Sequence, residues 1–426
     1  MAERTDVLIA GGGLTGLSLA VALRAAGIDV TVADAAPPGA ANDARASAIA
    51  AAARRMLDVL GVWQAVADQA EPIRDMVVTD SRVHEPVRPA LLTFAGDIGP
   101  AEGDAPGVGN VPGEDHGLGA GNVPGEAFAH MVPNTALVGA LEARAEALGV
   151  RVLHGVRVQD YVCGPRVEVL LAGGPDMSAR LLVGADGARS RVREIAGIRT
   201  VSWDYGQWAL VATVAHERPH GGRAEEHFLP SGPFATLPLR GNRASIVWTE
   251  READAKRIMG LDDAAFLREL ERRFGYRLGR LALVGGRGAF PLRLMIARDF
   301  VTERVALAGD SAHVIHPIAG QGLNMGLKDV AALAEIVVET ERLGLDIGAL
   351  DRLRLYERWR RFDTVAMGAA TDALNRLFSN DVAPIRMIRD FGLGLVDRMP
   401  FLKQFFIREA AGLLGDTPRL LRGEAL

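Results

Sequence analysis

The sequence predicts an α/β protein: a Rossmann-like nucleotide-binding domain, an inserted, mostly antiparallel β-sheet, and a helical C-terminus. Three observations support this fold class. A glycine-rich turn joins an apolar strand to a helix near the N-terminus. Alternating apolar residues and tryptophans follow residue 200, as expected for strands with one buried face. After residue 338 the apolar residues return with helical spacing.

Composition narrows the class of protein. The chain has 426 residues, enough for two or three domains, and is 49% hydrophobic against 24% charged, which is ordinary for a soluble enzyme. A net charge of −5 makes nucleic acid an unexpected partner. The single cysteine, Cys163, excludes a disulfide framework and a thiolate zinc cluster, and we expect it to be buried. We predict no metal site. Without a leader or a bilayer-length apolar run, we expect a cytoplasmic protein.

The first element is a strand over residues 6–10 followed at once by a glycine-rich turn, a helix and a second strand that ends at Asp34. This order is the context that a dinucleotide-binding fingerprint requires. Gly11 permits the tight turn, Gly13 lets the backbone approach a pyrophosphate, and Gly16 lets the helix pack on the sheet. Asp34 is placed to accept hydrogen bonds from ribose hydroxyls.

The next segments carry less chemistry. Arg45 stands just before an Ala-rich stretch that we expect to be helical, and it is either a solvated charge at the helix start or a guanidinium close to the cofactor. Residues 73–94 predict two strands. Residues 97–126 are rich in glycine, proline and acidic residues and contain the sequence GNVPGE twice, which predicts a flexible surface insertion.

Order returns after residue 130. We expect Asn134 or Thr135 to cap a helix that runs to about Leu148. A buried strand over residues 179–183 then ends in Gly-Ala-Asp-Gly, which contains Asp186. This motif is either a simple turn or, as a second junction between strand and helix, a surface that faces phosphate. Residues 200–290 predict an antiparallel sheet, a suitable wall for an apolar substrate.

The segment from 304 to 337 is the one around which the chain is organised. An apolar strand ends at Gly309, and Asp310 and a loop containing Pro317, Gly320 and Gly322 follow. The helix after the loop has apolar residues at gaps of four and three. A carboxylate beside a helix N-terminus suits a polar cofactor, because that end of a helix favours negative charge. Further helices are predicted over residues 349–379, 384–397 and 399–414.

Three motifs stand in a recognisable order: GGGLTG at 11–16, GADG at 184–187 and AGDSAHVIHPIAGQGLN at 308–324. Together they resemble the FAD-dependent aromatic hydroxylases of the 4-hydroxybenzoate hydroxylase superfamily. DARA at 43–46, VWT at 247–249, TDALNRLFS at 371–379 and RDFGL at 389–393 resemble its ubiquinone-biosynthesis branch. The resemblance covers nearly the whole chain except residues 97–126. Pro133 departs from it, because that branch usually has Glu before the residue equivalent to Asn134.

The resemblance implies non-covalently bound FAD, with NAD(P)H and O2 as co-substrates and a polyprenylphenol as the substrate. Hydroxylation would proceed through a flavin hydroperoxide. Pro317, through its carbonyl, and His316 are the implied catalytic residues; for His316 a packing or hydrogen-bonding role stays open. The implied cofactor-binding residues are Gly11, Gly13, Leu14, Thr15, Gly16, Asp34, Arg45, Asp186, Gly309, Asp310, Gly320, Gln321, Gly322, Leu323 and Asn324.

The resemblance also sets the expected domains. They are an FAD-binding domain (1–72, 131–195 and 290–345), a substrate-domain sheet (73–96 and 196–289), the insertion (97–126) and a helical region (346–426). The Phe-rich helix around 398–408 either packs on the protein or rests on the cytoplasmic membrane. Other ubiquinone-biosynthesis proteins are implied partners.

Two alternative functions stay open. One is hydroxylation of a soluble aromatic acid, which needs a basic clamp for the carboxylate. Arg218, Arg223 and Arg240 are its candidates. The other is a non-catalytic FAD-containing scaffold.

Overall fold

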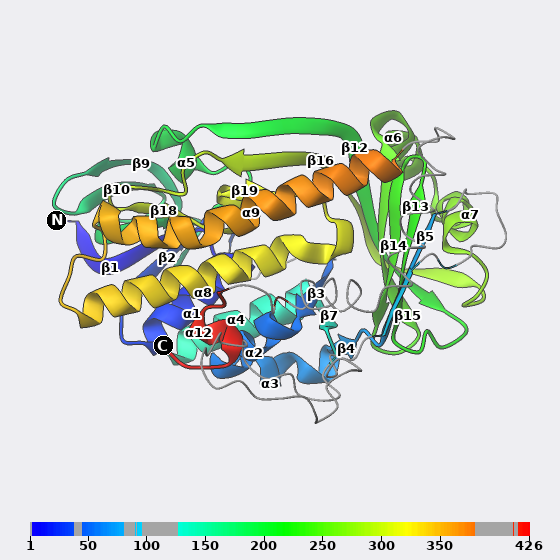
Figure 1. Ribbon diagram of the computed structural model, residues 1–426, viewed down its shortest axis with the longest axis horizontal. Helices are drawn as coiled ribbons and strands as arrows, with labels where there is room; N and C mark the ends of the chain where they lie inside the picture. The colour runs from blue at the N-terminus through cyan, green and yellow to red at the C-terminus, as the bar shows by residue number, and fades with distance from the viewer. Residues whose placement is uncertain are drawn as a thin grey trace, which may run out of the picture.

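Two large sheets lie at opposite ends of an elongated molecule in the computed structural model, and long helices run between them (Figure 1). The structure describes residues 2–37, 45–80, 90, 92–95, 127–379, 412 and 416–426. The predicted insertion and the predicted helices after residue 380 lie outside this part of the chain, apart from Gly412. Every helix in the described part is too short or too polar to span a bilayer.

The first sheet has a parallel core in which β1 lies between β11 and β2. Its strands are β1 (Glu3–Ala10), β2 (Val30–Asp34), β8 (Arg151–His154), β9 (Arg157–Cys163), β10 (Val167–Ala172), β11 (Met177–Gly184), β17 (Val301–Thr302) and β18 (Val305–Leu307). Val7, Leu8 and Ile9 are fully buried, as expected for a strand covered on both faces. Because β1, β2, β11 and β18 are parallel, their carboxyl ends meet at one edge.

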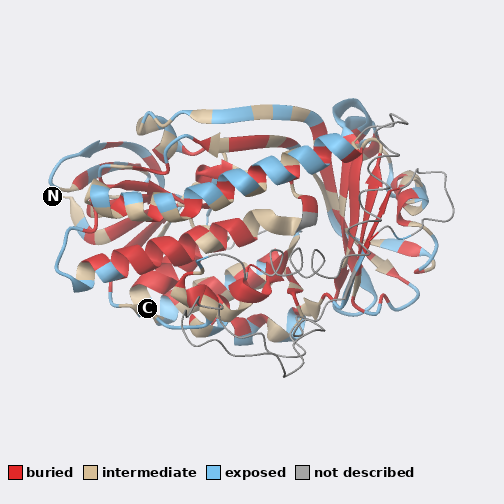
Figure 2. Cartoon of the chain, viewed as in Figure 1, coloured by how far each residue is buried: buried red, intermediate tan, exposed pale blue. Residues whose placement is uncertain are grey.

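Three long helices build the body next to this sheet. These are α1 (Leu14–Ala25), α8 (Gln321–Arg342) and α9 (Leu350–Phe378), and α8 packs between the other two. Figure 2 shows α8 buried along most of its length, whereas α9 has one buried and one exposed face. Helix α8, from the C-terminal half of the chain, thus packs against α1, the helix that follows the N-terminal glycine turn.

The second sheet is mostly antiparallel, with strand order β19-β16-β12-β15-β14-β13-β5-β6. Its strands are β5 (Asp75–Asp80), β6 (Leu92–Ala95), β12 (Thr200–His216), β13 (Arg223–Leu229), β14 (Gly232–Leu239), β15 (Arg243–Arg251), β16 (Leu281–Ala297) and β19 (His313–Val314). Helices α6 (Glu252–Met259) and α7 (Asp263–Phe274) cover one face. There Phe234, Trp248 and Phe266 form a fully buried aromatic core.

A small sheet of β3 (Ala46–Ala50), β4 (Glu71–Pro72) and β7 (Ala129–Pro133) connects the two ends. The remaining helices are α2 (Ala51–Val59), α3 (Trp63–Val66), α4 (Asn134–Ala147), α5 (Arg191–Ile195), α12 (Arg419–Arg422) and the short 3-10 helices at 67–69, 309–311 and 318–320.

Three predictions of local structure were wrong, and one strand was missed. The Ala-rich stretch after Arg45 begins as strand β3, because it pairs with β7, and its helix starts only at Ala51. Neither Asn134 nor Thr135 caps α4: Pro133 precedes the helix, and the Asn134 side chain instead accepts a hydrogen bond from Ser47. Cys163 is exposed rather than buried. Strand β10 was not predicted.

Candidate active site

The glycine turn between β1 and α1 brings backbone segments into contact. A Cβ on Gly16 would lie 1.9 Å from the Gly11 carbonyl oxygen, and one on Gly11 would lie 2.3 Å from the Ala185 carbonyl oxygen. Gly11 also has a φ of +106°, which side chains disfavour. Gly13 differs, because a Cβ there would meet no protein atom within 4 Å. Gly11 and Gly16 therefore serve packing, and Gly13 presents open backbone to a ligand.

A cavity of about 770 Å³ opens at this carboxyl edge, and we call it the nucleotide cavity. Its lining includes Gly11, Gly12, Gly13, Asp34, Asp186, Gly187, Arg189 and Arg191. Asp186 Oδ2 accepts hydrogen bonds from the backbone N–H groups of Arg191 and Val192, at 2.7 and 3.1 Å, so this carboxylate organises the start of α5. Its Oδ1 is buried without a partner among the described residues.

A second cavity of about 540 Å³, the ring cavity, lies between the parallel sheet's loops and the antiparallel sheet. It shares Gly13, Ala185 and Gly187 with the nucleotide cavity, so one extended ligand can occupy both. The predicted site residues in its lining are Gly13, Leu14, Thr15, Arg45, Asp310, His316, Pro317, Gly320, Gln321, Gly322, Leu323 and Asn324. Gly16 and Gly309 line neither cavity.

Helix α8 begins at the wall of the ring cavity. Gly320 precedes it as the N-cap residue, with a φ of +64° and no side chain of its own to cap the first turn. The N–H groups of that turn therefore provide partial positive charge at the cavity. Asn324 ties the helix to β3: its Oδ1 accepts from Ala50 N–H at 2.9 Å, and its Nδ2 donates to the Ala48 carbonyl oxygen at 2.8 Å.

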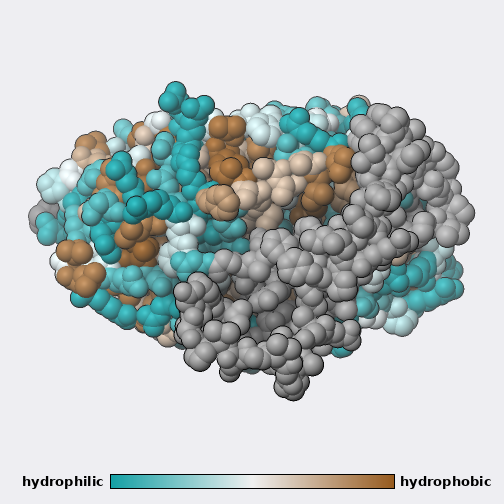
Figure 3. All heavy atoms as spheres, in the orientation of Figure 1, coloured by the Kyte–Doolittle hydropathy of each residue, from teal (hydrophilic) through white to brown (hydrophobic). Residues whose placement is uncertain are grey.

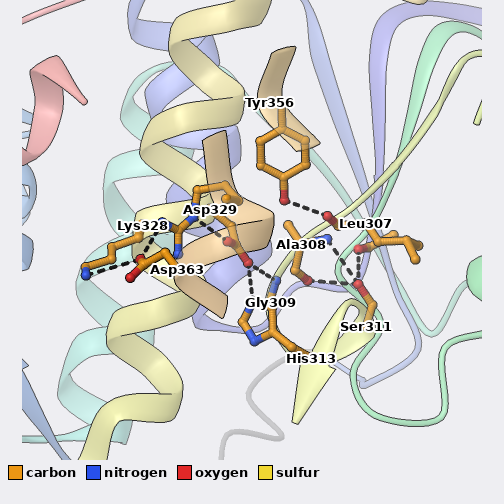
Figure 4. A network of polar contacts seen from close by, with 11 residues as sticks. Leu307, Ala308, Gly309, Ser311, His313, Lys328, Asp329, Tyr356 and Asp363 are labelled. Atoms are coloured by element: carbon orange, nitrogen blue, oxygen red, sulfur yellow. Dashed lines mark hydrogen bonds and ion pairs between the residues drawn. The ribbon is translucent and has the colours of Figure 1, made fainter. Parts of the chain in front are cut away.

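A buried polar network fixes the loop that carries Asp310 (Figure 4). At its centre is Asp329 of α8, which is fully buried. One carboxylate oxygen accepts the Gly309 backbone N–H at 3.0 Å and lies 2.6 Å from His313 Nε2, while the other accepts from Arg360 Nε at 2.9 Å. Burial by itself would raise the pKa of Asp329, but these cationic and N–H partners lower it below its ordinary value.

Helix α9 contributes to the same network. Arg360 bonds Asp363 as well as Asp329, and Tyr356 donates its hydroxyl to the Leu307 carbonyl oxygen at 2.7 Å (Figure 4). Ser311 closes the other side by donating to the Ala308 carbonyl oxygen at 2.8 Å. The turn on both sides of Asp310 is thus anchored to α8 and α9.

The Asp310 side chain itself is exposed within the ring cavity, whereas Nε2 of the buried His313 lies 2.6 Å from Asp329. Enclosure by protein raises the pKa of Asp310, and His313, Arg45 and Arg293 oppose this shift. Arg45 lies across the cavity with its guanidinium 5.2 Å from the ring centre of Phe290. Arg45 therefore belongs to the cavity rather than to a helix start.

His316 and Pro317 lie where the loop meets the second sheet. His316 is fully buried, and neither ring nitrogen has a hydrogen-bond partner among the described residues. Burial lowers the pKa of His316 to about 4, although Asp372 acts in the opposite direction. The Pro317 carbonyl oxygen accepts the Gly320 N–H at 3.0 Å. A carbonyl oxygen accepts two hydrogen bonds, and its predicted contact with substrate stays a prediction.

The opposite wall of the ring cavity is the face of the antiparallel sheet that points away from α6 and α7. Its lining is almost entirely apolar and consists of Met76, Ala209, Val211, Ala224, Pro233, Ala235, Leu237, Val247, Phe290 and Leu292, with Ser245, Thr249 and Glu226 as the polar exceptions. The three arginines considered for a carboxylate clamp lie elsewhere. Arg218 donates to the backbone carbonyl oxygen of Arg277, and Arg240 donates to that of Asp68. Arg223 forms an ion pair with Glu225.

Several of these residues were not foreseen from the sequence. Asp329 left a signal: it is an acid among the apolar, buried positions of α8. Arg360 and Tyr356 gave none, because their roles depend on how α9 packs against α8. Glu226 also gave none, because it follows Glu225 directly and alternation alone cannot say which of the two faces the cavity.

Comparison with known proteins agrees with this geometry. Residues 4–354 match the family described as "FAD binding domain". The chain is 44% identical to ubiquinone hydroxylase UbiL of Rhodospirillum rubrum (99% of this chain, 93% of the relative). It is 34% identical to 3-demethoxyubiquinol 3-hydroxylase of Escherichia coli (96% and 99%). In fold it is similar to p-nitrophenol 4-monooxygenase of Pseudomonas putida, with a TM-score of 0.77 at 18% identity (97% and 99% covered).

The two cavities fit FAD. Gly13 leaves backbone open where a side chain would fill the space, Asp34 lines the nucleotide cavity, and the α8 N-terminus lines the ring cavity. Backbone N–H groups and a carboxylate for ribose hydroxyls are the groups that a dinucleotide needs. The chain belongs to the FAD-dependent monooxygenases, in the family that contains the ubiquinone hydroxylases.

Proposed function

We propose that this protein hydroxylates the aromatic ring of a polyprenylphenol in ubiquinone biosynthesis, with FAD as cofactor and NAD(P)H and O2 as co-substrates. The names of its relatives support this reaction. The single observation that carries this proposal is the apolar sheet wall of the ring cavity, which suits a neutral, hydrophobic phenol. Bound FAD supplies the redox chemistry, in which electrons from NAD(P)H activate O2 for transfer to the ring.

The protein's own residues bind and orient. We assign Gly11, Gly13, Leu14, Thr15 and Gly16 to the pyrophosphate region, either by direct contact or by shaping the turn. Asp34 accepts from the adenosine ribose and Asp310 from the ribityl chain. Asp186, which lines the nucleotide cavity, faces the pyrophosphate and the nicotinamide donor, and Arg45 faces the phosphate or ribityl side.

The isoalloxazine end belongs to the loop and helix that line the ring cavity. Gly320, Gln321, Gly322, Leu323 and Asn324 hold the pyrimidine edge, where the α8 N-terminus favours negative charge. Gly309 acts indirectly, because its N–H anchors the loop to Asp329. Pro317 presents its carbonyl oxygen to the reacting hydroxyl.

His316 is neutral at physiological pH, since burial lowers its pKa, and it shields the reacting site from water.

A soluble aromatic acid is the weaker alternative. Its carboxylate would need a cationic partner, and among the described residues that line the ring cavity the one arginine is Arg45, on the flavin side. Arg218, Arg223 and Arg240 have other partners. Glu226, on the sheet wall, would disfavour an anionic ligand.

The test compares two phenols with the FAD-loaded protein. We expect 2-geranylphenol in detergent micelles to stimulate NAD(P)H oxidation and to gain one oxygen atom from labelled O2, detected by mass spectrometry. 4-Hydroxybenzoate should do neither. Hydroxylation of 4-hydroxybenzoate but not of geranylphenol would establish the alternative. Oxidation of neither phenol, with FAD fully bound, would support the function of a non-catalytic, FAD-containing scaffold.

We further propose that the protein acts in the cytoplasm at the membrane surface, where such a lipid resides, alongside other ubiquinone-biosynthesis proteins. The exposed face of α9 supports this location, since it is apolar over four turns and forms a band in Figure 3. Its members are Phe362, Val365, Ala366, Ala369, Ala370, Ala373 and Leu374. Co-sedimentation with phospholipid vesicles, lost when Phe362 and Val365 become serine, would test it.

A further inference from the structure

We propose that α9 holds the two walls of the ring cavity at a fixed spacing, and that Asn375 is the positioning residue through which it holds the sheet wall. This inference rests on the proposed function and explains how the substrate ring is placed relative to FAD. Asn375 belongs to the TDALNRLFS motif at 371–379, which forms the C-terminal end of α9.

One continuous helix contacts both walls. In the first half of α9, Tyr356 donates to the Leu307 carbonyl oxygen and Arg360 donates to Asp329, so this half is bound to the flavin-side wall. Near the other end, Asn375 contacts the antiparallel sheet. With a rise of 1.5 Å per residue, the stretch from Tyr356 to Asn375 spans about 28 Å. Figure 1 shows α9 running from the first sheet to the second.

The contact with the sheet is a buried chain of side-chain amides. Asn375 is 2% exposed, and its Nδ2 donates to Oε1 of Gln207 on β12 at 2.9 Å. Gln207 Nε2 in turn donates to the Ser231 carbonyl oxygen, in the turn before β14, at 2.8 Å. Ser379 orients the Asn375 amide by donating to its Oδ1 at 2.7 Å. The end of α9 is thus bound to β12 and, through Gln207, to the turn between β13 and β14.

Strand geometry places Gln207 directly beside the ring cavity. Alternate residues of a strand project to the same face, so Gln207, Ala209 and Val211 of β12 share one face. Ala209 and Val211 line the ring cavity, and so does Leu292, the partner of Gln207 on β16. Gln207 therefore occupies the next position on the face that forms the sheet wall, and a shift of Gln207 shifts that wall.

Two further contacts of the motif support the same docking. Phe378 stacks on Phe228 of β13 with ring centres 4.1 Å apart, and Asp372 accepts a hydrogen bond from Trp203 Nε1 of β12 at 3.0 Å. Phe228 pairs with Pro233 of β14, which lines the ring cavity. The end of α9 therefore docks on the strands of the sheet wall by hydrogen bonds and by aromatic contact.

The spacing of the walls matters because oxygen transfer depends on the position of the ring. Displacing a reacting group by about 1 Å can slow a reaction on the order of 100-fold. In productive turnover, NAD(P)H, a proton, O2 and the phenol give NAD(P)+, water and the hydroxylated phenol. When the ring is misplaced, NAD(P)H, a proton and O2 give NAD(P)+ and hydrogen peroxide instead. The yield of hydroxylated phenol per NAD(P)H oxidised therefore reports the position of the ring.

The experiment compares Asn375→Leu with the wild type, both loaded with FAD and supplied with 2-geranylphenol in detergent micelles. Leucine has about the size of asparagine but makes no side-chain hydrogen bond, so the end of α9 loses its bond to β12. We expect the yield of hydroxylated phenol per NAD(P)H to fall about tenfold, with hydrogen peroxide accounting for the difference. The phenol should still bind, but the change in flavin absorption should differ in shape from that of the wild type, because the ring lies elsewhere.

Thr371→Val is the matched control. Thr371 lies one turn earlier in α9 and is 3% exposed, but its hydroxyl donates to the carbonyl oxygens of Met367 and Gly368 within the same helix. Loss of this hydroxyl should lower thermal stability and keep the wild-type yield and absorption change. The yield is counted per NAD(P)H oxidised by folded, FAD-loaded protein, so a loss of stability alone does not change it.

A wild-type yield in Asn375→Leu, or an equal fall in Thr371→Val, would overturn the role of Asn375 while hydroxylation by the wild type upheld the function. A wild type that hydroxylates no phenol would overturn both. If Asn375→Leu does not fold, Gln207→Met removes the same hydrogen bond from the side of β12, and its yield decides in the same way.

Discussion

The two walls of the ring cavity are built on opposite principles. The flavin-side wall consists of a loop and a helix start whose positions are fixed by glycine packing and by the buried Asp329 network. The sheet wall consists of regularly paired antiparallel strands that present mainly apolar side chains to the cavity. The first wall presents backbone N–H groups at the start of α8, and we expect it to tolerate little change. The second recognises with side chains, which can change without disturbing the frame. Four predictions test this contrast, in order of expected effect.

The largest effect is expected from Asp329→Ala. Removing this carboxylate takes away the partner that the buried Arg360 and His313 share, which should lower the free energy of unfolding by about 3–5 kcal/mol. Denaturant unfolding monitored by circular dichroism measures this, and FAD content should fall with it. Glu252→Ala, in an exposed ion pair with Lys256, is the control and should cost less than about 0.5 kcal/mol. Equal effects of the two changes would contradict a rigid flavin-side wall.

Gly16→Ala and Gly13→Ala separate packing from ligand contact within one turn. A Cβ at Gly16 would meet the Gly11 carbonyl oxygen at 1.9 Å, so we expect a loss of about 3 kcal/mol of unfolding free energy. Gly13→Ala meets no protein atom and should unfold within about 1 kcal/mol of the wild type. It should nevertheless bind FAD more weakly. Stability and FAD affinity that fall in parallel in both variants would refute the separation.

The pH dependence of stability should report His316. Its pKa is lowered to about 4 in the folded protein, so below pH 6.5 the unfolded chain takes up a proton that the folded protein does not. Stability is therefore lost as the pH falls from about 6.5 towards 4, by roughly 2 kcal/mol between pH 7.5 and 5. His316→Leu should remove that part of the slope in denaturant titrations. The same slope in both proteins would show that His316 is not the group responsible.

The smallest effect on stability is expected in the sheet wall. Val247→Phe adds bulk toward the ring cavity. The free energy of unfolding should stay within about 1 kcal/mol of the wild-type value, and the FAD content should stay near that of the wild type. Affinity of the FAD-loaded protein for 2-geranylphenol should fall about tenfold, measured by the change in flavin absorption when the phenol binds. Val162→Phe, on an exposed position of the other sheet, is the control and should alter none of these. Loss of FAD from Val247→Phe would mean that the two walls are not independent.

The same contrast explains what could be predicted from sequence. The glycine turn, Asp34 and the run from Gly309 to Asn324 were readable because each is contiguous in the chain and follows a strand. The Asp329–Arg360 pair could not be read, because it depends on the packing of two helices. Strand β3 was missed because its partner β7 is distant in sequence and overrides an Ala-rich helical preference.

The pairing of β12 with β16 has a consequence for how this architecture can diversify. Thr200 pairs with Ala297, so the segment between them leaves the body of the chain and returns to it at one point. It contributes five strands of the antiparallel sheet and both covering helices. We therefore expect insertions and substitutions inside this segment to change which molecule is recognised without rerouting the rest of the chain. Five of the eight strands of the antiparallel sheet thus form one continuous, replaceable module, whereas β5, β6 and β19 belong to the surrounding chain.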